Sequence, residues 1–252
     1  MGWLRDWKRR RVLARHRIDD ALWASVTRAM PFVQRLDDGE TRRLRELALL
    51  FLAEKVFSAE RGLQLTEAMR LSIAVQAVLP VLELGLDSYA GWSGIVVYPG
   101  DFQVKREEVD EHGVVHQWDD ELVGESWPGG PVVLSWDAVH GEPGINVVIH
   151  EFAHKLDMAN GAADGMPPLH HGMDRGRWAG AWREAYEGFC DAVERGQQTW
   201  LDEYAAESEA EFFAVMSEAF FLDPLQARRR YPEVYGQLVQ FYRQDPAGRM
   251  DA

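Results

Sequence analysis

The chain has 252 residues, of which 46% are hydrophobic, and this content suffices for one or two packed cores. Its formal net charge of −14 argues against nucleic-acid binding, because that binding depends on Lys and Arg neutralising phosphates. The single cysteine, Cys190, excludes an internal disulfide, which fits a reducing cytoplasm.

The N-terminal segment 3–16 alternates Trp and Leu with Arg and Lys. This pattern predicts a short basic amphipathic helix, which serves either as a packed surface arm or as a docking segment for a partner or an anionic surface. The segment lacks the continuous apolar stretch of a secretory signal. The most apolar stretch, 71–86, is short and interrupted by polar residues and a proline. We therefore expect a cytoplasmic protein without a membrane span.

The first third of the chain carries apolar residues at helical spacing, over 19–57 and again over 67–79. Either Ser58 or Thr66 is placed to cap the second of these helical stretches. We expect residues 1–88 to form a helical N-terminal region packed on the core, so that the whole chain forms one compact unit.

The pattern changes after Gly91 to short β-branched and aromatic runs at 94–99, 102–104, 114–118 and 132–136, separated by Gly and Pro. These runs predict a small sheet. We interpret 131–136 as an edge strand that binds substrate by backbone pairing, through Val133, Leu134, Ser135 and Trp136. The alternative is a plain core strand.

The motif that follows is His150-Glu151-Phe152-Ala153-His154. On a helix, residues four apart share one face with Cβ atoms about 5–6 Å apart, so both imidazoles reach one metal ion. Glu151 is placed to act as general base on a water at that metal. Because the flanking residues are apolar, the helix is expected to be buried, and a metal supplies partners for its polar groups.

Downstream, 162–174 has the composition of a loop and contains His170-His171, which we interpret as exposed, with a metal site or a lid over the cleft as alternatives. Helical patterns follow at 176–194, 202–222 and 233–243. The predicted fold class is therefore α+β, mostly α-helical, with a small mixed β-sheet packed on the helix of the H-E-x-x-H motif.

A zinc ion held by two histidines needs a third protein ligand. A metzincin would place Gly and His at positions now occupied by Asp157 and Asn160, so that class is excluded. Asp157 as the third ligand is not excluded. It lies only three residues beyond His154 on the same helix, however, so a role that supports a ligand, or a place on the helix surface, is more natural. In a helix over 202–222, Tyr204, Glu211 and Glu218 share one face, since seven residues differ by only about 20°. The residues alone leave Glu211 and Glu218 equally placed as the ligand.

Three separated elements, HEFAHKLDMANG (150–161), GESW with GPVVLSW (124–127 and 130–136) and Tyr204…Glu211-Phe-Phe-Ala, together resemble the Mlc titration factor A family of zinc metallopeptidases. The last element is also similar to the catalytic domain of anthrax lethal factor. The resemblance implies a zincin-like core over 89–252 with a gluzincin-type site. It further implies one Zn²⁺ per chain held by His150, His154 and Glu211, with Glu218 in a supporting or structural role.

The same resemblance implies cleavage of peptide bonds with aminopeptidase-type activity, with Glu151 as the base and Tyr204 as a donor to the oxyanion. The family is also described as binding the transcriptional repressor Mlc. The rival hypothesis is a repressor-sequestering protein whose zinc site is residual or structural. The presence of Glu151 argues against it, because a structural site needs no base. A metal-dependent hydrolase of non-peptide bonds is a third hypothesis.

Overall fold

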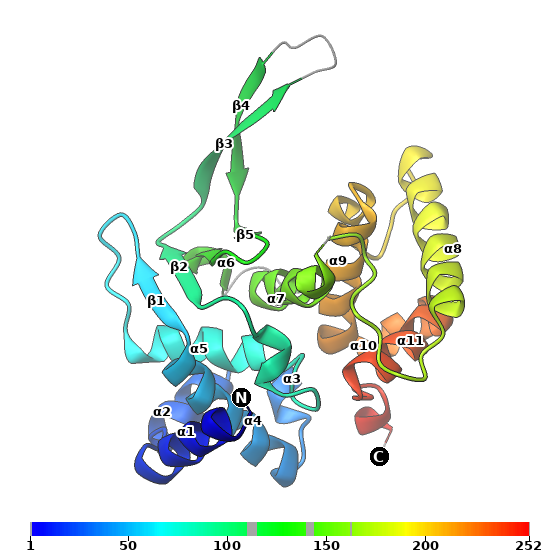
Figure 1. Ribbon diagram of the computed structural model, residues 1–252. Helices are drawn as coiled ribbons and strands as arrows, with labels where there is room; N and C mark the ends of the chain where they lie inside the picture. The colour runs from blue at the N-terminus through cyan, green and yellow to red at the C-terminus, as the bar shows by residue number, and fades with distance from the viewer. Residues whose placement is uncertain (1, 110–114, 140–143, 162, 252) are drawn as a thin grey trace.

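The computed structural model describes residues 2–109, 115–139, 144–161 and 163–251, with side chains over the same ranges except residues 2 and 103–122. The chain is mostly helical with a small mixed sheet, which confirms the predicted α+β class. In Figure 1 the N-terminal helices, the sheet and the C-terminal helices surround one central helix, α7 (Val147–Asp157).

The N-terminal region is helical as predicted. Thr66 caps the fifth helix, because its Oγ1 accepts a hydrogen bond from Met69 N at 3.2 Å. Ser58, the alternative cap, instead lies in a short strand that the sequence analysis did not predict. The elements of this region are α1 (Gly2–Arg15), α2 (Asp20–Thr27), α3 (Pro31–Gln34), α4 (Asp38–Glu54), β1 (Val56–Ala59), α5 (Glu67–Val78) and η1 (Leu86–Tyr89).

The main sheet has the strand order β1-β2-β6-β5, with β2 at Gly94–Tyr98, β5 at Gly124–Ser126 and β6 at Val132–Ser135. Strands β1, β2 and β6 are parallel, and β5 pairs antiparallel with β6. The prediction that 131–136 forms the edge strand is therefore wrong. The chain reverses between β5 and β6, so β6 is hydrogen-bonded on both sides and the preceding strand, β5, forms the edge.

Two further strands, β3 (Phe102–Val109) and β4 (Val115–Leu122), form a separate antiparallel hairpin. Figure 1 shows this hairpin projecting from the sheet. The runs predicted at 102–104 and 114–118 are thus extended, but they do not join the main sheet. Val114 lies outside the described residues.

The second half of the chain is helical. The helix predicted over 202–222 is interrupted before Glu209, because Ser208 caps a new helix there. Between the patterns predicted over 202–222 and 233–243, a further short helix ends at Arg230. The elements are α6 (Trp136–Val139), α7, η2 (Met158–Asn160), α8 (Arg175–Glu194), η3 (Glu203–Ala206), α9 (Glu209–Leu222), α10 (Pro224–Arg230), α11 (Pro232–Tyr242) and η4 (Gly248–Met250).

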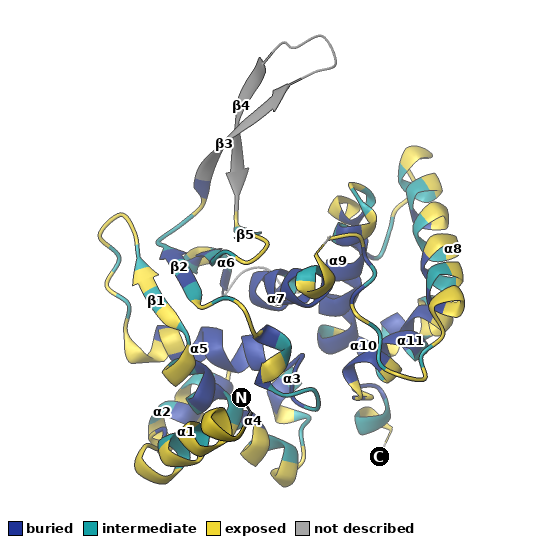
Figure 2. Cartoon of the chain, in the orientation of Figure 1, coloured by how far each residue is buried: buried dark blue, intermediate teal, exposed yellow. Residues whose placement is uncertain are grey.

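One cluster of buried side chains extends from Ile18 to Ala247, and Figure 2 shows that α7 and α9 lie almost entirely inside it. Phe152 anchors α7 in this core. Its ring centroid lies 5.6 Å from Phe51, 5.1 Å from Tyr89 and 5.6 Å from Trp92. Burying such a side chain stabilises the fold by about 1.5–3 kcal/mol. The helix of the motif is therefore held rigidly by residues from the first third of the chain.

Among the helices of the described residues, none combines the length and the apolar character needed to cross a membrane.

Candidate metal centre

Helix α7 presents the motif on its first two turns. Asn146 begins the helix, because its Oδ1 accepts a hydrogen bond from Ile149 N at 2.9 Å. His150 and His154 lie one turn apart on the same face, and their ring centroids are 4.8 Å apart. His154 and Glu151 are 6% and 4% exposed, so the motif is buried as its apolar flanks predicted.

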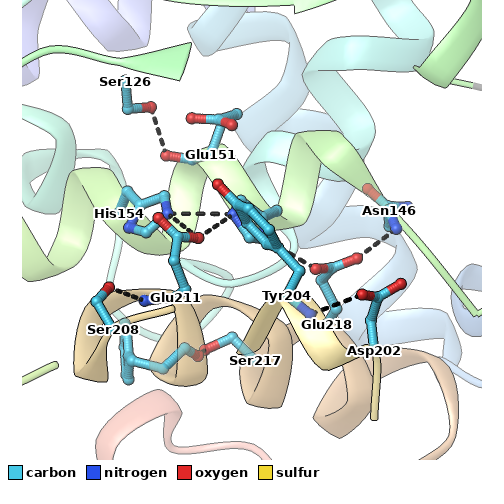
Figure 3. A network of polar contacts seen from close by, with 12 residues as sticks. Ser126, Asn146, Glu151, His154, Asp202, Tyr204, Ser208, Glu211, Ser217 and Glu218 are labelled. Carbon is cyan, nitrogen blue, oxygen red and sulfur yellow. Dashed lines mark hydrogen bonds and ion pairs between the residues drawn. The ribbon is translucent and has the colours of Figure 1, made fainter. Parts of the chain in front are cut away.

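Three side-chain atoms of the described residues converge on one point. His150 Nε2 and His154 Nε2 are 3.1 Å apart, and Glu211 Oε2 lies 3.0 Å from the first and 3.2 Å from the second. Figure 3 shows Glu211 reaching up from α9 toward His154 on α7. Ligand atoms of a tetrahedral zinc ion, at about 2.0–2.1 Å from the metal, lie about 3.3 Å from one another. The donor set and its spacing therefore fit one metal ion.

The electrostatics of the three groups also favour a cation at this point. Burial alone would lower the pKa of His150, but the carboxylates of Glu211 and Glu218 outweigh it and raise that pKa well above its ordinary value. Burial would raise the pKa of Glu211, but hydrogen bonds from His150 and His154 lower it to about 2. The carboxylates therefore favour positive charge at this point, and a metal ion that binds there takes the place of the proton on His150.

Glu218 contacts the ring nitrogen of His150 that faces away from Glu211. Its Oε1 lies 2.8 Å from His150 Nδ1, and its Oε2 accepts a hydrogen bond from Asn146 N at 2.5 Å. With the Nδ1 proton directed at Glu218, the Nε2 lone pair of His150 points toward Glu211. Asn146 is in turn held by Gln76, whose Oε1 accepts from Asn146 Nδ2 at 2.6 Å. Glu218 therefore occupies a supporting position, and the atom near both Nε2 atoms belongs to Glu211.

Glu211 lies in the first turn of α9, where its backbone N donates to Ser208 Oγ at 3.1 Å. Tyr204 lies in η3, before the interruption, so the prediction that Tyr204 shares a helix with Glu211 and Glu218 is wrong. The tertiary fold nevertheless brings its ring centroid to 6.1 Å from that of His150. The Tyr204 side chain is 42% exposed and stands over the metal centre in Figure 3.

Glu151 points away from the three converging atoms and toward the edge strand. Its Oε2 is buried without a hydrogen-bond partner among the described residues, and burial raises its pKa. Strand β5 passes so close that a Cβ on Gly124 would meet the Glu151 carboxylate and lie 2.6 Å from Val147 Cγ2. Ser126 Oγ donates to the backbone O of Glu151 at 2.9 Å. The edge strand therefore lies directly against the helix that carries the motif.

A cleft of about 530 Å³ opens beside these groups. Its apolar wall comes from β5, α7 and α9, and its polar groups include His150, Glu151 and Tyr204. Val133, Leu134, Ser135 and Trp136, which we predicted to bind substrate, are not among the described residues that line it. Leu134 and Ser135 are fully buried, as expected of an inner strand. The apolar lining of this wall comprises Val123, Val147, Val215, Ala219 and Leu222.

The remaining predicted groups lie elsewhere. Asp157 is fully buried, its Oδ2 accepts from Gly165 N at 2.8 Å, and burial raises its pKa to about 6. It therefore ties α7 to the following loop, and it is not part of the converging set. His170 Nε2 lies 2.7 Å from Phe241 O, and its ring stacks on Phe241. No described residue of the loop 161–174 lines the cleft, so the structure gives no support to a lid.

The sequence analysis did not predict the roles of two residues and one strand that organise the centre. Asn146 was identifiable as an N-cap, since it is an Asn directly before an apolar helical run. Gln76 carried no signal, because its partner lies 70 residues away. The third is strand β5, Gly124-Glu125-Ser126, which is too short for its sequence to predict a strand by itself.

Comparison with known proteins identifies the family. Residues 4–243 match the family described as glucose-regulated metallo-peptidase M90. The chain belongs to this family. Proteins named Mlc titration factor A are similar to it: the one from Serratia proteamaculans (strain 568) is 40% identical over 228 residues, which cover 88% of this chain and 87% of the relative. Those from Yersinia pestis (strain Pestoides F) and Yersinia pseudotuberculosis serotype O:3 (strain YPIII) are 37% identical over 227 residues, covering 88% of this chain and 84% of each relative.

Membership of a metallopeptidase family implies a bound metal, and the three converging side chains are the group of described residues suited to hold it. The resemblance on which the sequence analysis relied is therefore confirmed at the level of the family.

Proposed function

We propose that this protein is a zinc-dependent peptidase of aminopeptidase type, with His150, His154 and Glu211 as the zinc ligands. The observation that carries the proposal is the convergence of their three ligand atoms, 3.0 to 3.2 Å apart, with His150 and Glu151 lining one cleft. Two imidazoles and one carboxylate are a ligand set used by catalytic zinc, which keeps a further position open. When bound, zinc supplies a Lewis acid and lowers the pKa of a water toward about 7.

Glu151 is the general base in this proposal. Its Oε2 has no partner among the described residues, so it is available to accept the proton of an attacking water and to return it to the leaving amine. Burial raises its pKa, which brings its proton affinity closer to that needed near neutral pH. A structural metal site gains nothing from such a buried carboxylate.

Tyr204 is the candidate donor to the oxyanion of the substrate. Its side chain is 42% exposed and its ring lies 6.1 Å from that of His150, so the phenol faces the cleft from a short helix separate from α9. A phenol placed there donates a hydrogen bond to the substrate oxygen as negative charge develops on it.

Strand β5 replaces β6 as the candidate peptide-binding edge. One edge of β5 pairs with β6, and its other edge has no strand partner in the described sheet. Val123 and Gly124 line the cleft at this edge. An extended peptide that pairs with this outer edge gains backbone hydrogen bonds while its scissile bond lies beside Glu151.

A second function, binding of a repressor like Mlc, is favoured by the name of the relatives, Mlc titration factor A. It is compatible with peptidase activity on a different surface, and we propose a cytoplasmic location for both. The alternative, a repressor-sequestering protein with a residual zinc site, predicts that Glu151 is dispensable.

Hydrolysis of amino-acid 4-nitroanilides by the zinc-loaded protein, with and without a chelator, tests the proposal. The substitution Glu151→Gln should retain zinc and lower turnover by about 10²–10⁴-fold. Glu203→Gln is the matched control, because Glu203 is an exposed carboxylate on η3 outside the metal centre. Acetylation of the substrate amine should abolish cleavage if the activity is of aminopeptidase type. Normal turnover by zinc-loaded Glu151→Gln protein would exclude the mechanism and favour sequestration.

A further inference from the structure

The turn that follows the edge strand is fastened to the helix of the motif by one buried lysine. Lys155 is 4% exposed and lies on α7, directly after His154. Its Nζ donates to Trp127 O at 2.6 Å and to Gly130 O at 2.8 Å. These carbonyls belong to the two ends of the turn that joins β5 to β6, so a single ammonium group holds both ends of the turn.

The surroundings of Lys155 suit this role. Its Nζ also lies 4.8 Å from the ring centroid of Trp92, so two carbonyls and an aromatic face receive the charge. A buried ammonium requires such partners, and its removal takes this donor from Gly130 O and leaves Trp127 O with the donor Gly130 N alone. The turn itself is tightly built: Gly130 N donates to Trp127 O at 3.0 Å, and a Cβ on Gly130 would lie 2.8 Å from Trp127 Cβ.

A second fastening lies one helical turn earlier. Ser126 Oγ donates to Glu151 O at 2.9 Å, so α7 holds β5 at Glu151 and the turn after β5 at Lys155. The same helix carries the two histidines of the metal centre and Glu151. The position of the edge strand relative to these groups is therefore determined by α7.

We propose that Lys155 is a positioning residue. By holding the turn after β5, it keeps the edge strand where a bound peptide presents its scissile bond to the metal centre. This inference rests on the proposed peptidase function. It assigns Lys155 no contact with the reacting atoms. Its loss should weaken peptide binding, while the ligand atoms and Glu151 keep their places.

The chain provides a matched control in Lys55. Its Nζ donates to Tyr89 O at 2.9 Å and to Trp92 O at 2.7 Å, and it lies 3.5 Å from the same Trp92 ring. Lys55→Met thus removes a partly buried ammonium with two carbonyl acceptors and one aromatic face, as Lys155→Met does. Lys55 makes no contact of this kind with β5 or its turn.

The first measurement is amide hydrogen exchange of the zinc-loaded protein, followed over residues 123–131. Lys155→Met should accelerate exchange in this segment by about tenfold or more, whereas Lys55→Met should leave it unchanged. This measurement does not depend on any activity. Equal exchange in both variants and the unmodified protein would overturn the inference.

The second measurement is steady-state hydrolysis of unblocked tetra-alanine. Lys155→Met should raise KM by about five- to tenfold, the worth of roughly one hydrogen bond, with kcat changed less than about twofold. Lys55→Met should change neither constant, and zinc affinity should be the same in both variants. The effect should be smaller for alanine 4-nitroanilide, because a single residue pairs less with the strand.

The outcomes separate the two proposals. If the unmodified zinc-loaded protein hydrolyses neither substrate, the proposed function fails. If it is active and Lys155→Met leaves KM unchanged, or lowers kcat alone, the positioning role fails while the peptidase function stands. Should Lys155→Met not fold, Ser126→Ala removes the other fastening with a smaller change. It should raise KM for tetra-alanine in the same direction by about two- to fivefold, and an unchanged KM there overturns the inference.

Discussion

The substitution Glu218→Gln tests the arrangement behind the metal centre most directly. Glu218 is 4% exposed, and its two oxygens receive two donors, His150 Nδ1 at 2.8 Å and Asn146 N at 2.5 Å. A glutamine offers one oxygen and one NH2 group, so one of the two donors is left facing another donor. The charge that stabilises the histidine is removed as well.

The magnitude follows from these contacts. A hydrogen bond to a charged group contributes about 1.5–3 kcal/mol, and every 1.4 kcal/mol is a tenfold change in an equilibrium constant. We therefore expect Glu218→Gln to weaken zinc binding by about 10–100-fold, the range typical for a group that supports a ligand. Glu211→Gln should weaken zinc binding far more, because a neutral amide is a poor zinc ligand.

Competitive chelator titration of both variants measures these affinities. Glu209→Gln serves as the control, since Glu209 is an exposed carboxylate in the same helix. If Glu218→Gln loses zinc while Glu211→Gln retains it, the assignment of the ligand is wrong by about two helical turns, and the supporting role of Glu218 is refuted with it.

Three further predictions address the edge strand, the oxyanion donor and the pH dependence of stability. Gly124→Ala should destabilise the fold by about 1–3 kcal/mol and lower kcat/KM, because the added Cβ would displace Glu151. Denaturant unfolding measures the first effect and steady-state kinetics the second. A variant with unchanged stability and kinetics would contradict the packing of β5 on α7. Tyr204→Phe should bind zinc normally and lower kcat by about 10²–10³-fold, and unchanged turnover would remove Tyr204 from the mechanism. Burial lowers the pKa of Lys55 from 10.5 to about 8, so the unfolded chain binds more protons between these values, and stability should rise with pH across that window. Thermal unfolding from pH 8 to 10.5 should show a shallower rise for Lys55→Met than for the unmodified protein, and equal slopes would contradict the shift.

The sequence by itself determined the features of the site that depend on residues close together in the chain. The two histidines and Glu151 were identifiable because a spacing of four residues defines a helix face whatever the rest of the chain does. The burial of that helix followed from its apolar flanks, and the α+β class followed from the periodicities on either side of it.

The tertiary structure decided the rest, because it depends on contacts between residues far apart in the sequence. Glu211 and Glu218 are equivalent by spacing, and only the packing of α9 on α7 brings Glu211 to the Nε2 atoms and Glu218 to Nδ1 of His150. The edge of the sheet is β5, and not β6 as the sequence predicted. Strand order depends on long-range pairing, which a run of apolar residues does not encode. Tyr204 lies near His150 although the helix is interrupted between Tyr204 and Glu211. The packing of η3 on its neighbours, and not helical periodicity, places it there.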